Sequence, residues 1–468
     1  MRLREQVLRG GTYLILRQGL GVVIGAAGIL VLTRIIGPAA YGEYATAFAL
    51  SAYLASVSQL GLGVWLIRHP GELPSSHCDT AFSLLLVLSA AGIALGLLSI
   101  LLLRPWLPVE NFGLLAAALV AGLPVQLAAV VPMARFERAL DYGRVARIEI
   151  GGRAACYLAA LPLAGAGFGA WAAVAGWWSE QLVVLAAVYW ASGFRPRWLW
   201  DRALAREMVG YGLGYSGATW IRQLGNLINP LLLGRFLGAE GVGYAALAIR
   251  IVESLSFAAI ATLRLSLSAL ARVQQDRARL TQAITEGTRL QLAALGAPLV
   301  GFAWASPWLL PWLFGDRWTP VLEIYPFIAL YYLTHAMFNL HLSVLSVLKH
   351  NREVAVINAT NVALVAAGVG VLVWKFGLAG YGWGLALGLL SCAVARHYVV
   401  KLVGRPDYGL AILWWAAAAL AVFAAELGPW TALGLVAALL WPGTRRELRK
   451  YAGEFRQLRG GVNPSPGM

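Results

Sequence analysis

Two stretches of the sequence, LTRIIGPAAYGEYATA at residues 32–47 and LGRFLGAEGVGYAALA at residues 233–248, align with each other without a gap. Each stretch is a glycine-rich turn that joins two long apolar runs. Two copies of one turn indicate an internal repeat, and the alternative is a chance similarity between two glycine-rich turns. The identical positions are Leu32/Leu233, Arg34/Arg235, Gly37/Gly238, Gly42/Gly243, Ala45/Ala246 and Ala47/Ala248.

The composition of the whole chain places these apolar runs in a membrane. Of the 468 residues, 59% are hydrophobic and 13% are charged, whereas a soluble protein has about 45–50% apolar and about 25% charged residues. A membrane-spanning helix needs about 20 mostly apolar residues. This criterion predicts an all-α polytopic protein with about fourteen spans, of which the last two are short and could form one re-entrant pair. The predicted spans are residues 12–33, 41–63, 80–103, 112–133, 148–164, 168–190, 209–233, 241–262, 290–313, 321–347, 354–374, 379–400, 410–425 and 429–441.

The basic start of the chain, MRLREQVLRG, superficially resembles a signal peptide. The apolar run that follows it is longer than the usual signal-peptide core, and no cleavage site of the A-x-A type accompanies it. We therefore expect this run to be the first span and to be retained.

The basic residues test this map independently, because cytoplasmic loops retain Lys and Arg during membrane insertion. Of the 37 basic residues, 28 fall on one side of the predicted membrane, five on the other and four inside spans. This bias predicts that both termini lie in the cytoplasm. It also accounts for the net charge of +15 without nucleic-acid binding. The five residues on the predicted outer side are Arg34, Arg104, Arg235, Arg317 and Lys375.

The repeat and the spans together predict four parts of the chain. Residues 1–205 form an N-terminal lobe of six helices, and residues 206–403 form a second lobe of six. Residues 404–443 contribute the two additional spans, and residues 444–468 form a basic cytoplasmic tail. An even number of spans in each repeat makes the lobes parallel copies, with the substrate path between them.

Residues 265–291, within the second lobe, are too polar for the bilayer. Leu270, Val273, Leu280 and Ile284 recur there near helical spacing among arginines. This pattern predicts an amphipathic helix that lies on the cytoplasmic membrane surface and joins the lobes. The sequence GGVNPSPGM at residues 460–468 predicts a disordered end.

Four segments carry a family resemblance: GTYLILRQGL in the first span, LTRIIGPAAYGEYA at the outer turn, SQLGLGVWLIRHP after the second span, and SALARVQQDRARLTQAI between the lobes. The first three resemble the start of Wzx-type polysaccharide transporters of the MOP superfamily, and the fourth is similar to that family's linker. The resemblance implies a place in the bacterial inner membrane. Members of this family are flippases for lipid-diphosphate-linked oligosaccharides. The resemblance therefore implies an undecaprenyl-diphosphate-linked glycan as substrate, and a glycan polymerase and chain-length regulator as further partners. Arg17 matches an arginine that recurs in the family. The chain departs from the family at Ala39 and Ala40, where an acidic residue is common, so any role for that charge is in doubt.

Polar residues inside the predicted spans are the candidates for a substrate site, because a charge at bilayer depth usually faces a cavity or a partner. Arg222, Asn226 and Asn229 share one helix face just before Pro230 and could instead form a structural polar clamp. Arg250 and Glu253, three residues apart, could be a neutralising ion pair. Arg17 could reach the cytoplasmic surface. The predicted substrate-binding residues are Arg17, Arg222, Asn226, Asn229 and Arg250.

Two carboxylates at mid-span, Glu180 and Glu253, are candidates for coupling transport to protons or sodium ions. Pairing of Glu180 with an arginine is the alternative. Arg153 and Glu149 are expected to pair at a cytoplasmic helix end. His335, Asn339, Asn358 and Asn361 are expected to bond across helices.

The three cysteines, Cys78, Cys156 and Cys392, are scattered and indicate neither a disulfide framework nor a metal site. No cofactor and no catalytic residue are predicted.

The sequence thus predicts a flippase that works by alternating access and is not an enzyme. Arginines suit a diphosphate because the guanidinium group offers a fixed fork of donors. A MATE-like exporter of cationic drugs is the first alternative, and it would favour acidic and aromatic cavity residues. A membrane-embedded glycan polymerase or ligase is the second, and the short outer loops of this sequence offer little room for its catalytic groups.

Overall fold

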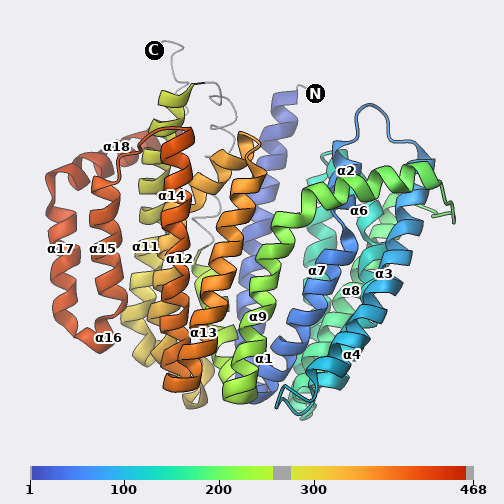
Figure 1. The fold of residues 1–468 in the computed structure, drawn as a ribbon, viewed down its shortest axis with the longest axis horizontal. Coiled ribbons are helices and arrows are strands. Elements are labelled where there is room, and N and C mark those ends of the chain that lie inside the picture. The colour runs from blue at the N-terminus through green and yellow to red at the C-terminus, as the bar shows by residue number, and fades with distance from the viewer. Residues whose placement is uncertain (1–2, 257–275, 460–468) are drawn as a thin grey trace.

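The computed structural model describes residues 3–256 and 276–459, and these residues form helices joined by turns, with no strand among them (Figure 1). The first part of the chain begins with one very long helix, and shorter helices follow it. The helices of this part are α1 (Leu3–Gln59), α2 (Leu62–Arg68), α3 (Ser75–Leu103), α4 (Phe112–Val120), α5 (Leu123–Ala128), α6 (Val130–Arg138), α7 (Tyr142–Gly165) and α8 (Ala170–Ser192).

A second very long helix, α9 (Arg202–Leu255), opens the second part. After residues 257–275 the described chain continues to the C-terminal helix α18 (Pro442–Arg459). The elements between them are α11 (Arg277–Phe314), η1 (Asp316–Trp318), α12 (Val321–Val347), α13 (Asn351–Gly388), α14 (Ser391–Leu402), α15 (Gly409–Val422), α16 (Ala424–Leu427), η2 (Pro429–Thr431) and α17 (Ala432–Leu440).

Three of the long helices bend at a single glycine. Gly37 in α1 has φ 77°, Gly238 in α9 has φ 67° and Gly377 in α13 has φ 59°. Glycine adopts positive φ without the steric cost that other residues incur. Each of these helices therefore contains two apolar segments that meet at the glycine, and Gly37 and Gly238 occupy aligned positions of the repeated sequence.

The two repeated turns pack against each other through backbone atoms. A Cβ added at Gly42 would collide with the carbonyl oxygen of Ala239, and one added at Gly243 would collide with that of Pro38. Pro38 and Ala239 are aligned positions, so the contact is reciprocal. Small residues let two membrane helices approach this closely, and α1 and α9 cross here in direct contact.

Within residues 3–256 and 276–459, eight helices are long and apolar enough to cross a membrane by length and composition, and α7 is not among them. They are Ile24–Gln59, Ser75–Leu103, Phe112–Arg138, Ala170–Ser192, Arg202–Leu255, Arg277–Phe314, Val321–Val347 and Asn351–Leu402. Gly409–Val422 and Pro429–Leu440 are shorter apolar helices. The count differs from the predicted fourteen for a structural reason. The first, fifth and eighth of these helices each hold two predicted spans, and the predicted span 148–164 lies in α7.

The predicted amphipathic helix at residues 265–291 requires a correction. Residues 265–275 lie outside the described residues, and from Arg277 onward the segment is the start of α11, which runs without a break into the predicted span 290–313. Leu280 and Ile284 do not face a membrane surface, since they are buried in a cluster with Val344 of α12 and Val399 of α14. The predicted disordered end at residues 460–468 also lies outside the described residues.

α1 and α9 occupy the middle of the molecule (Figure 1). The helices from α2 to α8 lie to one side of this pair, and the helices from α11 to α17 lie to the other. α18 lies at the end of the molecule where α1 begins. This arrangement leaves the space beside α1 and α9 open to side chains from both parts of the chain.

Candidate functional site

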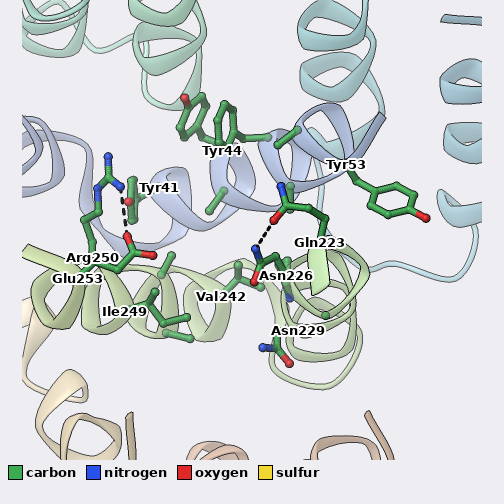
Figure 2. Close-up of a pocket in the computed structure, with 18 of the residues that line it drawn as sticks. Tyr41, Tyr44, Tyr53, Gln223, Asn226, Asn229, Val242, Ile249, Arg250 and Glu253 are labelled. Atoms are coloured by element: carbon green, nitrogen blue, oxygen red, sulfur yellow. Dashed lines mark hydrogen bonds and ion pairs between the residues drawn. The ribbon is translucent and has the colours of Figure 1, made fainter. Parts of the chain in front are cut away.

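A cavity of about 690 Å³ lies between the two parts of the chain. Its walls come from α1, α5, α7, α8, α9, α12 and α13, and Figure 2 shows residues of α1 and α9 on its surface. Three arginines and two glutamates are among the described residues that line it. These charged residues are Arg153, Arg222, Arg250, Glu180 and Glu253.

Arg222, Asn226 and Asn229 of α9 all line this cavity. The helix face that their spacing predicted therefore faces the cavity. Asn226 Nδ2 donates to Gln223 Oε1 at 2.8 Å. Asn229 Oδ1 is buried and has no hydrogen-bond partner among the described residues. The Arg222 guanidinium makes no hydrogen bond or ion pair with any residue that the structure describes. This wall therefore offers a guanidinium group that no described acidic side chain neutralises.

Arg250 and Glu253 form the ion pair that their spacing predicts, with Nη1 and Oε2 3.3 Å apart (Figure 2). The hydroxyl of Tyr332 on α12 donates to the other oxygen of Glu253 at 3.5 Å. The two side chains remain 42% and 45% exposed, because they project into the cavity. The pair is accessible to a substrate or an ion.

The structure places Arg153 differently from the prediction. Its Nη2 lies 3.6 Å from Glu180 Oε1 across the α7–α8 contact, and both residues line the cavity. Arg153 therefore belongs to the cavity wall, where it pairs with Glu180. Glu180 lines the cavity and pairs with an arginine. Such pairing was the alternative to a coupling role for this carboxylate.

Arg17 lies in α1, but its side chain falls outside the described part of the chain. Both glutamates of the cavity wall are paired with arginines, so Arg222 is the described lining arginine without an ion pair. The described cavity wall thus carries an excess of positive charge.

Aromatic side chains make up much of the remaining wall, and the sequence reasoning missed them. Ligand pockets are commonly lined by aromatic residues with a few convergent polar groups. The spacing of Tyr41 and Tyr44 on one helix face was the available signal. The aromatic lining residues are Tyr41, Tyr44, Phe48, Tyr53, Tyr157, Trp177, Tyr331, Tyr332 and Tyr381.

Polar residues of α12 and α13 bond across helices, as expected. The hydroxyl of Tyr331 donates to Asn361 Oδ1 at 2.9 Å, and Asn361 Nδ2 donates to the Gly388 carbonyl and to Ser391 Oγ, each at 3.1 Å. Asn358 Nδ2 donates to the Ala218 carbonyl of α9 at 3.4 Å. These contacts fix the part of the cavity wall that Tyr331, Asn358 and Asn361 line.

A family model described as "Polysaccharide biosynthesis protein" matches residues 31–323, which is more than half of the chain. The succinoglycan biosynthesis transport protein ExoT of Rhizobium meliloti is 24% identical over 308 residues, which cover 63% of this chain and 60% of that protein. The teichuronic acid biosynthesis protein TuaB of Bacillus subtilis is 26% identical over 164 residues, which cover 34% of each chain. The aligned regions thus span less than two thirds of these relatives.

Solved structures of transporters share the fold. The lipid II flippase MurJ in an inward closed conformation superposes with a TM-score of 0.71 at 10% identity, covering 96% of this chain and 99% of that one. An inward-facing multidrug resistance MATE family transporter of the MOP superfamily superposes with a TM-score of 0.56 at 16% identity, covering 84% and 94%. The chain has several helices that are long and apolar enough to span a membrane, and it shares its fold with membrane transporters. It is therefore a multi-pass membrane protein.

Proposed function

Because the chain belongs to the family of polysaccharide biosynthesis proteins, we propose that it is a flippase that moves an undecaprenyl-diphosphate-linked oligosaccharide across the bacterial cytoplasmic membrane. The observation that carries the proposal is the unpaired Arg222 in a cavity whose other described charges are paired. A guanidinium group in such a site attracts a diphosphate and repels a cation. The glycan and the diphosphate cross through the cavity while the lipid tail stays in the hydrocarbon.

Transport proceeds by alternating access between two lobes of six spans each, and α15 and α17 supply two further spans. The bends at Gly37 and Gly238 and the reciprocal contacts of Gly42 and Gly243 support this repeat, because both occur at aligned positions. Parallel repeats place the substrate between the lobes, which is where the cavity lies. A glycan polymerase and a chain-length regulator act on the product of this step.

The topology has both termini in the cytoplasm and is tested by thiol labelling. Cysteines that replace Ala166, Asp316 and Lys375, one at a time, are expected to react with a membrane-impermeant maleimide added to intact cells from outside. Cysteines that replace Arg202 and Arg279 are expected to react only after permeabilisation. All five positions are exposed, so the contrast reports the side of the membrane. Labelling in the reverse pattern would invert the map.

A MATE-like exporter of cationic drugs is the second candidate, because a transporter of that class shares the fold and the aromatic lining suits a flat cation. The charges favour the flippase. An exporter of cations would need free carboxylates, whereas both described glutamates of the cavity are paired with arginines. A polymerase or ligase is a weaker candidate, because the relative ExoT is a transport protein and the similar structure MurJ is a flippase.

Proton or sodium coupling acts through Glu180 and Glu253. Reorientation of the lobes changes the access of water and ions to each ion pair, and an ion or proton can then replace the arginine as the partner of the carboxylate. The variant Glu180→Gln/Glu253→Gln is expected to move substrate in proteoliposomes at a rate that no longer responds to an imposed proton or sodium gradient. Glu240→Gln, a change outside the cavity wall, should leave the response intact. A double variant with the wild-type gradient response would exclude these residues from coupling.

A further inference from the structure

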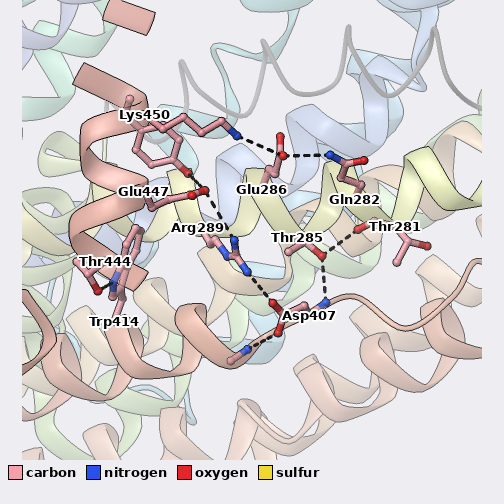
Figure 3. Close-up of polar contacts among 12 residues, drawn as sticks. Thr281, Gln282, Thr285, Glu286, Arg289, Asp407, Trp414, Thr444, Glu447 and Lys450 are labelled. Atoms are coloured by element: carbon pink, nitrogen blue, oxygen red, sulfur yellow. Dashed lines mark hydrogen bonds and ion pairs between the residues drawn. The ribbon is translucent and has the colours of Figure 1, made fainter. Parts of the chain in front are cut away.

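The C-terminal helix α18 docks onto the start of α11 through charged and polar side chains (Figure 3). Arg289 of α11 lies 2.7 Å from Asp407 and 3.7 Å from Glu447 of α18. Lys450 of α18 pairs with Glu286 of α11 at 3.4 Å. Arg289 and Glu447 are both largely buried, so α18 and α11 pack against each other at this ion pair.

One further contact holds the same face of α18, because Trp414 Nε1 on α15 donates to Thr444 Oγ1 at 2.8 Å. Within α18, the hydroxyl of Tyr451 donates to Glu447 at 3.3 Å. Burial and the neighbouring Glu447 carboxylate raise the pKa of Tyr451, so its hydroxyl stays protonated and can donate. Thr444, Glu447 and Tyr451 are three and four residues apart and share one helix face. That face of α18 therefore packs against the rest of the protein.

Among the described side chains of α18, three arginines lie away from this face and make no ion pair. Arg445, Arg446 and Arg449 are exposed. Leu448 is exposed on the side where Arg445 also lies, because positions three residues apart fall on one side of a helix. Trp441, the residue before α18, is exposed as well. A helix with arginines beside an apolar strip is typical of segments that lie in the plane of a membrane surface.

The position of α18 directly after an apolar helix indicates its depth in the membrane. It begins two residues after α17, an apolar helix that exposes Leu433, Val436 and Leu439. Trp441 therefore stands where α17 leaves the hydrocarbon, and tryptophan is enriched at that boundary. In Figure 1, α18 runs from the end of α17 toward α11 and not away from the molecule.

We propose that α18 is a membrane-surface helix that binds the headgroups of anionic phospholipids through Arg445, Arg446 and Arg449. Lipid phosphates match the arginines, and the acyl-chain boundary covers Trp441 and Leu448. An acidic soluble protein would match the arginines but leave the two apolar side chains exposed. Since α18 is fixed to α11 and α11 packs on α12, the headgroups anchor the C-terminal part of the cavity wall to this leaflet. The proposal does not depend on which substrate is transported.

The full-length protein, purified from vesicles of phosphatidylcholine and phosphatidylglycerol, tests the binding. Native mass spectrometry is expected to show preferential retention of phosphatidylglycerol. Arg445→Gln/Arg446→Gln/Arg449→Gln is expected to lose that preference more than tenfold, because each basic residue at an anionic surface strengthens attraction about fivefold. The matched control Arg277→Gln/Lys349→Gln/Arg352→Gln removes the same charge from exposed positions outside α18 and should keep the preference.

A second measurement locates the helix and remains informative even if the triple variant folds poorly. In a Cys156→Ser background, a nitroxide on Leu448→Cys is expected to collide more with oxygen than with a water-soluble nickel complex. A nitroxide on Arg446→Cys is expected to show the opposite ranking. Equal lipid preference in the two triple variants, or a water-exposed label at position 448, would overturn the proposal.

Discussion

Replacing Arg222 with alanine is expected to remove most flipping activity while the protein still inserts into the membrane. Arg222 has no partner among the described residues, so its guanidinium is free to meet the diphosphate. A hydrogen bond to a charged group contributes about 1.5–3 kcal/mol, which corresponds to about a ten- to hundredfold loss. Insertion should not suffer, since removing a charge at bilayer depth makes insertion easier. Activity is measured as surface glycan in cells and as translocation of the lipid diphosphate in vesicles.

Three further variants separate this role from a structural one. Arg222→Lys keeps the charge but loses the planar fork, so a partial loss is expected. Arg17→Ala is expected to deepen the defect of Arg222→Ala, whereas Arg352→Ala, at an exposed position away from the cavity, should be neutral. Wild-type transport in Arg222→Ala, Arg17→Ala and their double variant would refute the cationic substrate cavity and support the polar clamp.

A methyl group at the glycine crossing is expected to hold the outer end of the cavity open. The Cβ of Gly42→Ala meets the carbonyl oxygen of Ala239, and that of Gly243→Ala meets the carbonyl oxygen of Pro38. Neither backbone can move aside cheaply, and overpacking costs about 1–3 kcal/mol, so the equilibrium between closed and open forms shifts about five- to hundredfold. Transport should fall accordingly, because each cycle needs closure at this end.

The native Cys156 reports that opening directly, since it lines the cavity while Cys78 and Cys392 are buried. An impermeant maleimide added from outside is expected to label Cys156 faster in Gly42→Ala/Gly243→Ala than in the wild type. Gly301→Ala is the matched control, because an added Cβ there has no atom within 4 Å. Unchanged labelling of Cys156 together with unchanged transport would show that the crossing is not a gate.

The sequence predicted the features that local rules determine. The aligned glycine-rich stretches predicted a turn in each, and the helices bend there at Gly37 and Gly238, because glycine adopts positive φ without steric cost. The spacing of Arg222, Asn226 and Asn229 predicted one face of α9, and the structure turns that face toward the cavity. Periodicity was sufficient in these cases because neighbours on one helix are fixed by its geometry.

Features that depend on packing between helices were predicted wrongly or missed. Arg153 has Glu149 four residues away, but its cavity partner Glu180 lies on another helix and cannot be found from spacing. Leu280 and Ile284 form an apolar face whether it meets a membrane surface or α12 and α14, and the structure shows the second. Aromatic lining has the same ambiguity, since a tyrosine in a span fits a core as well as a cavity.

Direct measurement of the transported substrate tests the central claim. Wild-type protein is reconstituted into vesicles that contain a fluorescent undecaprenyl-diphosphate oligosaccharide in both leaflets, and an impermeant reagent then quenches the molecules that reach the outer leaflet. We expect the quenched fraction to rise well above that of protein-free vesicles, and we expect matched vesicles loaded with a cationic dye to retain it. A quenched fraction equal to that of protein-free vesicles, together with rapid export of the dye, would contradict the flippase and establish the exporter.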